Sequence, residues 1–422
     1  MIITATARTA AATRPVFLVI FFVLAGWTTT VHALNILVVG GSGRVGGSTV
    51  RWLEEYGSRG ILEDVQLAVG CRTQASFDKA KQKGVLPKSV QRFVALDLNV
   101  PENNNNNNNN NSKDDSIASA IQGFDLVVHT AGPFQGRTDP TLLRACVQQK
   151  IPYVDVCDEY ELAVTSKKEL MDLAQKAKVP AVVCGGIWPG MSALMAAEAK
   201  AKLEAQTGEK CDTLDLSFFT AGTGNAGPTI VSATFLLLAT PALVFMNGLA
   251  AKKEPWTEPR TVDFGPGVGN KPIWLLDNPD VPTTATTLGV PNVSSRFGTD
   301  PLPWNYLFGA MKAIPRPLLY NREAMQAFAL FSEPIIRFVD RLVGATNAMR
   351  VDAKTADGKH VVTSRIVHPD LEVCVGLATA AFCVEVLKGT IAPGIWYPAE
   401  LSQEARTNLL EAVKEDTISY MV

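Results

Sequence analysis

The chain has 422 residues, 47% of them apolar and 19% charged, which is the composition of a globular protein with material for two or three domains. Its formal net charge is −2. Binding to nucleic acid, or to anionic membranes in general, needs surplus cations that neutralise phosphate groups. A chain with this net charge has no such surplus, so its composition indicates neither kind of partner.

The first 33 residues have the layout of a secretory signal peptide. A basic start without acidic residues precedes the apolar run Val16–Gly26, and Val31 and Ala33 are small residues in front of an expected cleavage point. The run is too short to span a bilayer comfortably. We expect residues 1–33 to be removed on entry to the endoplasmic reticulum lumen; a plastid reached through that compartment is the alternative destination.

Short valine-rich runs then alternate with helical patterns, which is typical of βαβ units and a parallel sheet. Six strands in this rhythm predict a complete Rossmann domain over residues 34–200. The expected strands are 35–39, 65–69, 91–95, 125–129, 153–156 and 181–184. The expected helices are 45–56, 78–83, 116–122, 141–149 and 161–178.

The asparagine run Asn103–Asn111 interrupts this domain. A polar homopolymer has no apolar surface to bury, so we expect residues 101–115 to be a disordered surface insert. Its length adds little to the entropy of closing a loop.

The second half of the chain has a different pattern. Strands are expected at Leu214–Thr220 and Arg350–Val362, among apolar helices and proline-rich stretches. This predicts a second, α+β domain over residues 210–370, for substrate binding or dimerisation. A helix at Leu371–Leu387 opens a C-terminal segment, 371–422, which we expect to return to the first domain.

The stretch Thr229–Ala250 is apolar almost throughout and approaches membrane-spanning length. Pro241 lies within it, and a proline in the interior breaks a helix. A buried helix broken near Pro241 is the favoured interpretation, and contact with a membrane or lipid is the alternative.

The strongest motif lies between the first expected strand and helix. Its residues are Gly41, Ser42, Gly43, Arg44, Val45 and Gly46. A GxGxxG sequence in this context is the dinucleotide-binding fingerprint. Gly41 would permit the tight turn, Gly43 the approach of a pyrophosphate, and Gly46 close packing of helix and strand. The free N–H groups at the start of the helix would then bind the phosphates.

The end of the second strand selects between the two nicotinamide cofactors. An NAD enzyme usually carries an acid there, to bind the ribose 2′-hydroxyl. This chain has Arg72 instead, which can pair with a 2′-phosphate through two parallel hydrogen bonds. NADP is therefore the expected cofactor, with NAD as the alternative.

Three further strand ends are expected at the same edge of the sheet. Asp97 follows the third strand, where a Rossmann domain meets the adenine. The fourth strand is followed by a backbone expected beside the nicotinamide, namely Ala131, Gly132 and Pro133. Asp155 and Asp158 follow the fifth strand with Glu159, and are candidates to exchange a proton or bind a substrate amine. Helix capping by Asp158 is the alternative.

Two other patterns predict no separate chemistry. The second GxGxxG, Gly222–Gly227, lacks a following strand with a ribose-binding residue, so we expect a glycine loop at a helix start that holds a substrate carboxylate or only packs tightly. The seven cysteines contain no CxxC pair. Most are expected to be buried thiols, and no metal site is expected.

Several segments together resemble the saccharopine dehydrogenase-like (saccharopine reductase) family. They are VVGGSGRVGG, VGCR, HTAGPFQ, LLRACVQQKIPYVDVCDE, CGGIWPGMSALMA and GTIAPGIWYPAE. The resemblance covers Asn35 to about Leu194 and the last part of the chain, and is thin between them. It implies a Rossmann domain, NAD(P), a small-molecule substrate, and a second domain that binds substrate and often forms a homodimer.

Members of this family reduce imines or form secondary amines, and relatives include enoyl reductases that act on lipids. We therefore expect an NADP-dependent oxidoreductase that transfers hydride to or from an imine, amine or enoyl-type substrate. Two alternatives stay open. One is a dinucleotide-binding protein that senses redox state without catalysis, because no Tyr-x-x-x-Lys acid–base pair is evident. The other is a lipid-associated enoyl reductase.

Overall fold

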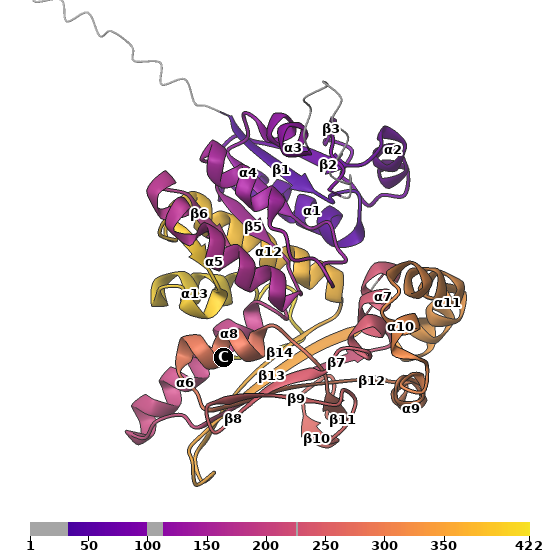
Figure 1. Cartoon of the computed structure of the whole chain (residues 1–422), viewed down its shortest axis with the longest axis vertical. Helices are drawn as coiled ribbons and strands as arrows, with labels where there is room; N and C mark the ends of the chain where they lie inside the picture. Colours follow the sequence, from indigo (N-terminus) through magenta and orange to yellow (C-terminus); the bar gives the residue numbers. More distant parts are fainter. Residues whose placement is uncertain (1–32, 99–112, 225–226) are drawn as a thin grey trace, which may run out of the picture. The chain divides into compact units, whose positions relative to one another are not determined.

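The computed structural model describes residues 33–98, 113–224 and 227–422 (Figure 1). The expected signal peptide, apart from Ala33, and most of the expected asparagine-rich insert lie outside these residues, so both stay predictions. The helix expected from Ser116 begins earlier, at Lys113. The last residues of the predicted insert are therefore helical.

The first sheet is parallel and has seven strands in the order β15-β6-β5-β4-β1-β2-β3. The six strands expected from sequence are all present. Their bounds are β1 (Leu34–Val39), β2 (Val65–Cys71), β3 (Arg92–Ala95), β4 (Leu126–His129), β5 (Tyr153–Asp155) and β6 (Pro180–Val182). The seventh, β15 (Gly394–Trp396), comes from the far end of the chain and pairs with β6.

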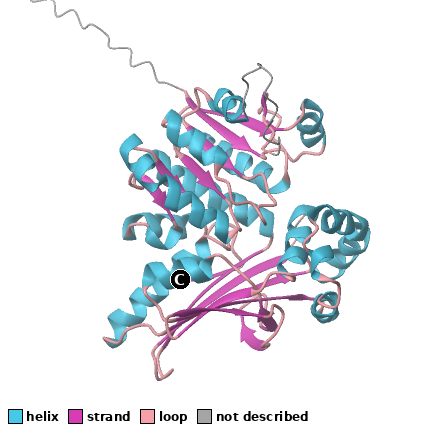
Figure 2. Cartoon of the chain, viewed as in Figure 1, coloured by secondary structure: helices cyan, strands magenta, loops and turns pink. Residues whose placement is uncertain are grey.

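Helices cover both faces of this sheet, as Figure 2 shows. Side chains that alternate along a strand enter opposite cores, so Val38 packs with the α1 side and Leu37 with the α4 side. On the first side lie α1 (Arg44–Ser58), α2 (Gln74–Gln82), α12 (Leu371–Lys388) and α13 (Gln403–Ala412). On the other lie α3 (Lys113–Ile121), α4 (Thr141–Gln149) and α5 (Tyr160–Ala177).

Helix α12, the first element of the C-terminal segment, packs tightly on α1. At their closest approach, a Cβ on Gly376 would lie 2.3 Å from Ser48 Oγ, so only glycine fits there. The fold class is thus the expected one, with a C-terminal segment that completes the first domain.

The second sheet is mixed, with the order β10-β11-β12-β7-β13-β14-β16. Its central strand β7 (Thr213–Ala221) pairs in parallel with β12 (Asn292–Asp300) and antiparallel with β13 (Thr346–Lys354). The other strands are β8 (Ala242–Met246), β9 (Leu249–Lys253), β10 (Arg260–Asp263), β11 (Asn270–Leu275), β14 (Val361–His368) and β16 (Ser419–Met421).

Helices α6 (Met191–Thr207) and α8 (Asp280–Leu288) lie on one face of the second sheet, and the short η1 (Pro398–Glu400) packs against both. The remaining helices form a separate group with its own core, visible in Figure 1 beside the sheet. They are α7 (Pro228–Leu237), α9 (Leu302–Met311), α10 (Arg316–Leu319) and α11 (Arg322–Val343).

Several boundary predictions were wrong. The apolar stretch expected as one broken helix over Thr229–Ala250 is α7 followed by the β8–β9 hairpin, because Pro241 precedes a strand. The strand expected over Arg350–Val362 is a hairpin that turns between β13 and β14.

The domain boundary placed at residue 200 falls inside α6. Segment 371–422 does not all pack on the first domain, since β16 pairs with β14.

Within the described residues, no helix is long and apolar enough to cross a membrane. All seven cysteines are buried and free, as expected for inert thiols. The same residues contain no group of three or more His, Cys, Asp or Glu side chains placed to bind a metal ion.

Candidate functional site

The glycine-rich loop after β1 lies at the carboxyl edge of the first sheet. Gly46 packs as expected: a Cβ there would lie 2.5 Å from both Gly40 O and Thr130 Oγ1. The tight turn, however, belongs to Gly40 and not to Gly41. Gly40 has φ +84°, and its Cβ would lie 2.6 Å from Ala131 N. Gly41 instead packs against Val38 O and Val69.

The N-terminus of α1 opens directly from this loop. Gly43 is the N-cap, no side chain caps the helix, and its first turn holds no acidic residue. Helix N–H groups left without such partners are an anion-binding site. Gly43 is exposed, and among the described residues a Cβ on it would meet only Gly40 O, at 3.2 Å. Ser42 and Val45, which flank this opening, are half-buried.

The side chain of Arg44 does not face this opening. It forms an ion pair with Glu372, at the start of α12. Glu372 Oε1 also accepts a hydrogen bond of 2.6 Å from Gly227 N, at the start of α7. The second glycine motif therefore binds a carboxylate of its own chain. Arg44 therefore lies in the glycine loop but has its side chain engaged by Glu372.

Arg72 and Asp97 lie beyond neighbouring strands at the same edge. Arg72 directly follows β2 and is exposed, so its guanidinium is accessible to a ligand. Asp97 is half-buried after β3, and its charge acts on Arg137. Burial and the neighbouring Arg322 lower the pKa of Arg137.

The loop after β4 is fixed from the second domain. Arg322, the first residue of α11, donates a hydrogen bond of 2.5 Å from Nη2 to Pro133 O. Gly132 N is bonded to Thr130 O, and Ala131 lies against Gly40. The backbone expected beside a nicotinamide is therefore positioned by contacts with both domains. Nothing in the sequence around Arg322 indicated this role.

Asp155 is buried and its carboxylate is fully bonded. Oδ1 accepts from Cys157 N at 3.0 Å and from Cys184 N at 2.8 Å, and Oδ2 accepts from Tyr153 OH at 3.1 Å. Tyr153 OH is also 2.9 Å from His129 Nδ1. Burial raises the pKa of Asp155 to about 6. This carboxylate ties together the ends of β5 and β6, which makes it a structural group.

Asp158 has a different environment. Its Oδ2 accepts a hydrogen bond of 2.7 Å from Gln135 Nε2. Asp158 Oδ1 and Gln135 Oε1 are both buried, and neither has a hydrogen-bond partner among the described residues. Burial raises the pKa of Asp158 to about 6. Helix α5 is capped by Glu159, which accepts from Glu161 N, so the alternative of capping by Asp158 was wrong.

A family model for the saccharopine dehydrogenase NADP binding domain matches residues 36–184. The chain carries a saccharopine dehydrogenase-type NADP-binding domain. It is therefore an NAD(P)-dependent oxidoreductase, and NADP is its cofactor. The open N-terminus of α1 and exposed Arg72 fit this cofactor. No curated protein sequence matches the chain.

The apo saccharopine dehydrogenase (L-Glu forming) of Saccharomyces cerevisiae has a similar structure, with 15% sequence identity and a TM-score of 0.57. The match covers 92% of this chain and 100% of that one. The DAP dehydrogenase of C. glutamicum in complex with DAP is 12% identical, covers 91% and 99% of the two chains, and has a TM-score of 0.40. At 15% identity the first likeness shows the fold.

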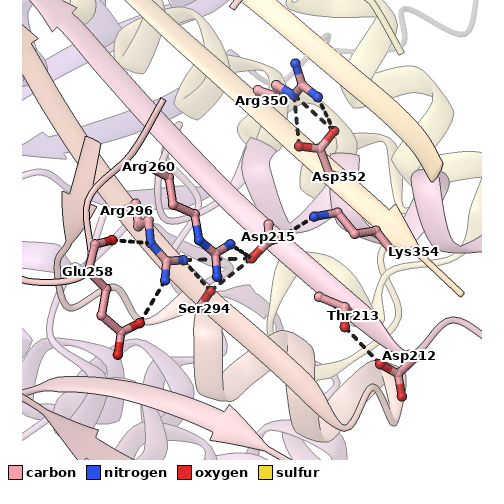
Figure 3. Close-up of polar contacts among 10 residues, drawn as sticks. All are labelled: Asp212, Thr213, Asp215, Glu258, Arg260, Ser294, Arg296, Arg350, Asp352 and Lys354. Carbon is pink, nitrogen blue, oxygen red and sulfur yellow. Dashed lines mark hydrogen bonds and ion pairs between the residues drawn. The ribbon is translucent and has the colours of Figure 1, made fainter. Parts of the chain in front are cut away.

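A charged cluster lies apart from the NADP-binding domain, on the face of the second sheet opposite α6 and α8 (Figure 3). Asp215 is central: Lys354 Nζ is 2.7 Å and Arg260 Nη1 2.8 Å from its carboxylate. Arg296, only 3% exposed, lies between Asp215 at 3.8 Å and Glu258 at 3.1 Å. The cluster lines a cavity of about 240 Å³. These cations each have a carboxylate partner, so we assign the cluster to stability.

Proposed function

We propose that this oxidoreductase transfers hydride between NADP and the carbon–nitrogen bond of an imine or amine substrate. The observation that carries the proposal is the pair of acceptors Asp158 Oδ1 and Gln135 Oε1, both buried and without a donor in the described residues. Buried polar groups in folded proteins are almost always hydrogen-bonded. A substrate with N–H groups, above all a cationic amine or iminium, would supply both donors.

The roles of the other residues follow from their positions at the sheet edge. The N–H groups of the first turn of α1 would bind the pyrophosphate, with Gly43 allowing its approach. Arg72 would bind the 2′-phosphate, and Asp97 lies where the adenine is expected. The nicotinamide would lie beside Gly132 and Pro133, where Arg322 fixes the backbone. The bound cofactor supplies or accepts the hydride.

Asp158 would bind the substrate nitrogen and exchange its proton. Burial raises its pKa and the hydrogen bond from Gln135 lowers it, with smaller effects of the charges on Glu159, which raises it, and Arg322, which lowers it; the pKa is left at about 6. The carboxylate is then mostly ionised at pH 7 and complements a cationic nitrogen, while staying close enough to neutrality to exchange protons. We expect kcat/KM to rise with pH through about 6.

The test is a turnover screen with NADPH against panels of imines, enones and keto acids offered with amines. We expect turnover with the carbon–nitrogen substrates and a loss of roughly a hundredfold or more in kcat for Asp158→Asn, the typical contribution of a positioned acid or base. NADPH affinity should stay within a factor of two or so. Glu161→Gln, at an exposed position in the first turn of α5 three residues after Asp158, is the matched control.

Two other results would replace the proposal. Turnover confined to enones would identify an enoyl reductase. NADPH binding without turnover of any panel, in wild type and variants alike, would favour a dinucleotide-binding protein that senses redox state.

A further inference from the structure

Exposed apolar side chains are concentrated in one segment of the chain. Of the 18 large apolar residues that are exposed in the described part of the chain, 11 lie within residues 302–342. Single exposed apolar residues are normal on soluble proteins, whereas a continuous apolar patch marks an interaction surface. This segment comprises α9, α10 and α11.

Helix α11 has one broad apolar side, of which one part is buried and another part is exposed. Its inner face is buried in the core shared with α7, through Met325 and Ile336 among others. The outer face carries residues spaced four, three and four apart, which places them in one row along the helix. They are 78%, 64%, 61% and 70% exposed, in the order Phe331, Ile335, Phe338 and Leu342. An amphipathic helix of a monomer would carry polar residues on this face.

Helix α9 repeats this arrangement. Its inner residue Phe308 packs against Phe235 of α7 and against Trp256. Tyr306 and Leu307 point outward and are 66% and 60% exposed. Apolar side chains are therefore exposed on more than one helix of this group.

The charge of this segment is opposite to that of the chain. Residues 302–342 contain five basic and three acidic residues, whereas the whole chain has a net charge of −2. Arg341 is exposed beside Phe338 and Leu342, and Lys312 follows the end of α9. Phenylalanine and leucine on one face with basic residues at its border are typical of helices that lie in a membrane interface.

We propose that the outer faces of α9, α10 and α11 dock on a lipid bilayer that contains anionic headgroups. The apolar side chains would enter the boundary between headgroups and acyl chains, and Arg341 and Lys312 would pair with headgroup phosphates and carboxylates. A second copy on the same face would bring like charges together. Helices that dock in this way lie in the interface, parallel to the bilayer. This inference is independent of the substrate.

The test is co-sedimentation of the full chain with vesicles of phosphatidylcholine alone and of phosphatidylcholine with an equal part of phosphatidylserine. We expect binding mainly to the anionic vesicles. The double substitution Phe331→Ser and Phe338→Ser should lower the partition coefficient by about tenfold or more, because two exposed aromatic anchors are lost. Arg341→Gln should lower binding to the anionic vesicles by about fivefold.

The matched control is Leu249→Ser, which alters a side chain that is 73% exposed in the β8–β9 turn, away from the patch. It should bind as the wild type does. Wild type that stays in the supernatant with both vesicles overturns the proposal. A dimer in light scattering that the double substitution turns into a monomer, without vesicle binding, assigns the face to a second copy. NADPH affinity, measured in the same samples, reports separately on the oxidoreductase site.

Discussion

Single atoms decide what each glycine of the β1–α1 loop can tolerate. A Cβ on Gly46 would lie 2.5 Å from Gly40 O and 2.5 Å from Thr130 Oγ1. A Cβ on Gly43 would meet Gly40 O at 3.2 Å, with no second contact within 4 Å among the described residues. We expect Gly46→Ala to lower the free energy of unfolding by about 1–3 kcal/mol, because the helix must move. Gly43→Ala should lower the free energy of unfolding less than Gly46→Ala does, but it should weaken NADPH binding. Urea unfolding and NADPH titration of both variants check this. Equal destabilisation would contradict it.

At the end of β2, Arg72 takes the place of an acid. A bidentate contact with the 2′-phosphate should contribute about 1.5–3 kcal/mol, so we expect NADPH to bind at least roughly tenfold more tightly than NADH. Arg72→Asp should reverse or abolish the preference. Affinities of both cofactors for both proteins check this. Equal affinities in the wild type would show that Arg72 does not select the cofactor.

The carboxyl of Asp280 makes stability depend on pH. It is 1% exposed at the start of α8 and accepts hydrogen bonds from Ser192 Oγ and from Gly190 N at 3.3 Å. Burial raises its pKa to about 7, above the value of about 3.9 in an unfolded chain. The native state alone retains the proton between these values, so stability falls as pH rises from about 4 through 7.

Asp280→Asn removes this dependence. Compared with wild type, the variant should be more stable at pH 8, by roughly 1–3 kcal/mol, and the difference should shrink toward pH 5. Urea unfolding at the two pH values measures it. A variant that is less stable at pH 8 would mean that the ionised carboxylate is favoured in the native state.

Among the elements, the central strands of the second sheet depend on Asp215. Burial opposes its ionisation, but the hydrogen bond from Lys354 and the charges of Arg260 and Lys354 outweigh this and lower its pKa. Asp215→Ala leaves Glu258 as the one carboxylate that the structure places beside the buried Arg296 among the described residues. We therefore expect the free energy of unfolding to fall by about 1–3 kcal/mol. Thermal melting checks it.

The control for this substitution is Asp263→Asn, at the exposed rim of the same cluster, where the side chain is 50% exposed and a salt bridge contributes little. Equal melting temperatures for the wild type and Asp215→Ala would show that the cluster does not stabilise the sheet.

At the scale of the whole molecule, the first domain is not continuous in sequence. Residues 33–207 lack α12, which covers α1, and β15, which pairs with β6. A fragment of these residues would expose an apolar helix face and an unpaired strand edge, so we expect it to aggregate or unfold without cooperativity. Addition of a fragment beginning at Leu371 should restore part of the circular dichroism signal. Cooperative unfolding of the first fragment alone would contradict this.

The sequence by itself determined the elements of the first domain and its nucleotide loop. Valine-rich strands at regular intervals and a GxGxxG between strand and helix are local patterns, and local patterns are read from neighbours in the chain. For the same reason the absence of an acid beside Arg72 could be recognised. The hairpin at β13–β14 was missed although Asp357-Gly358, a dipeptide typical of hairpin turns, stands between the two strands.

Only the tertiary structure decided which side chains meet. It separated Asp155, bonded by three donors, from Asp158, which has a buried oxygen without a partner in the described part of the chain, although the two are near neighbours in sequence. It brought Arg322 to the loop after β4, across a separation of 189 residues. It also showed that part of the apolar side of α11 is exposed. Hydrophobicity predicts that a residue favours burial, but exposure depends on which surfaces the rest of the fold covers.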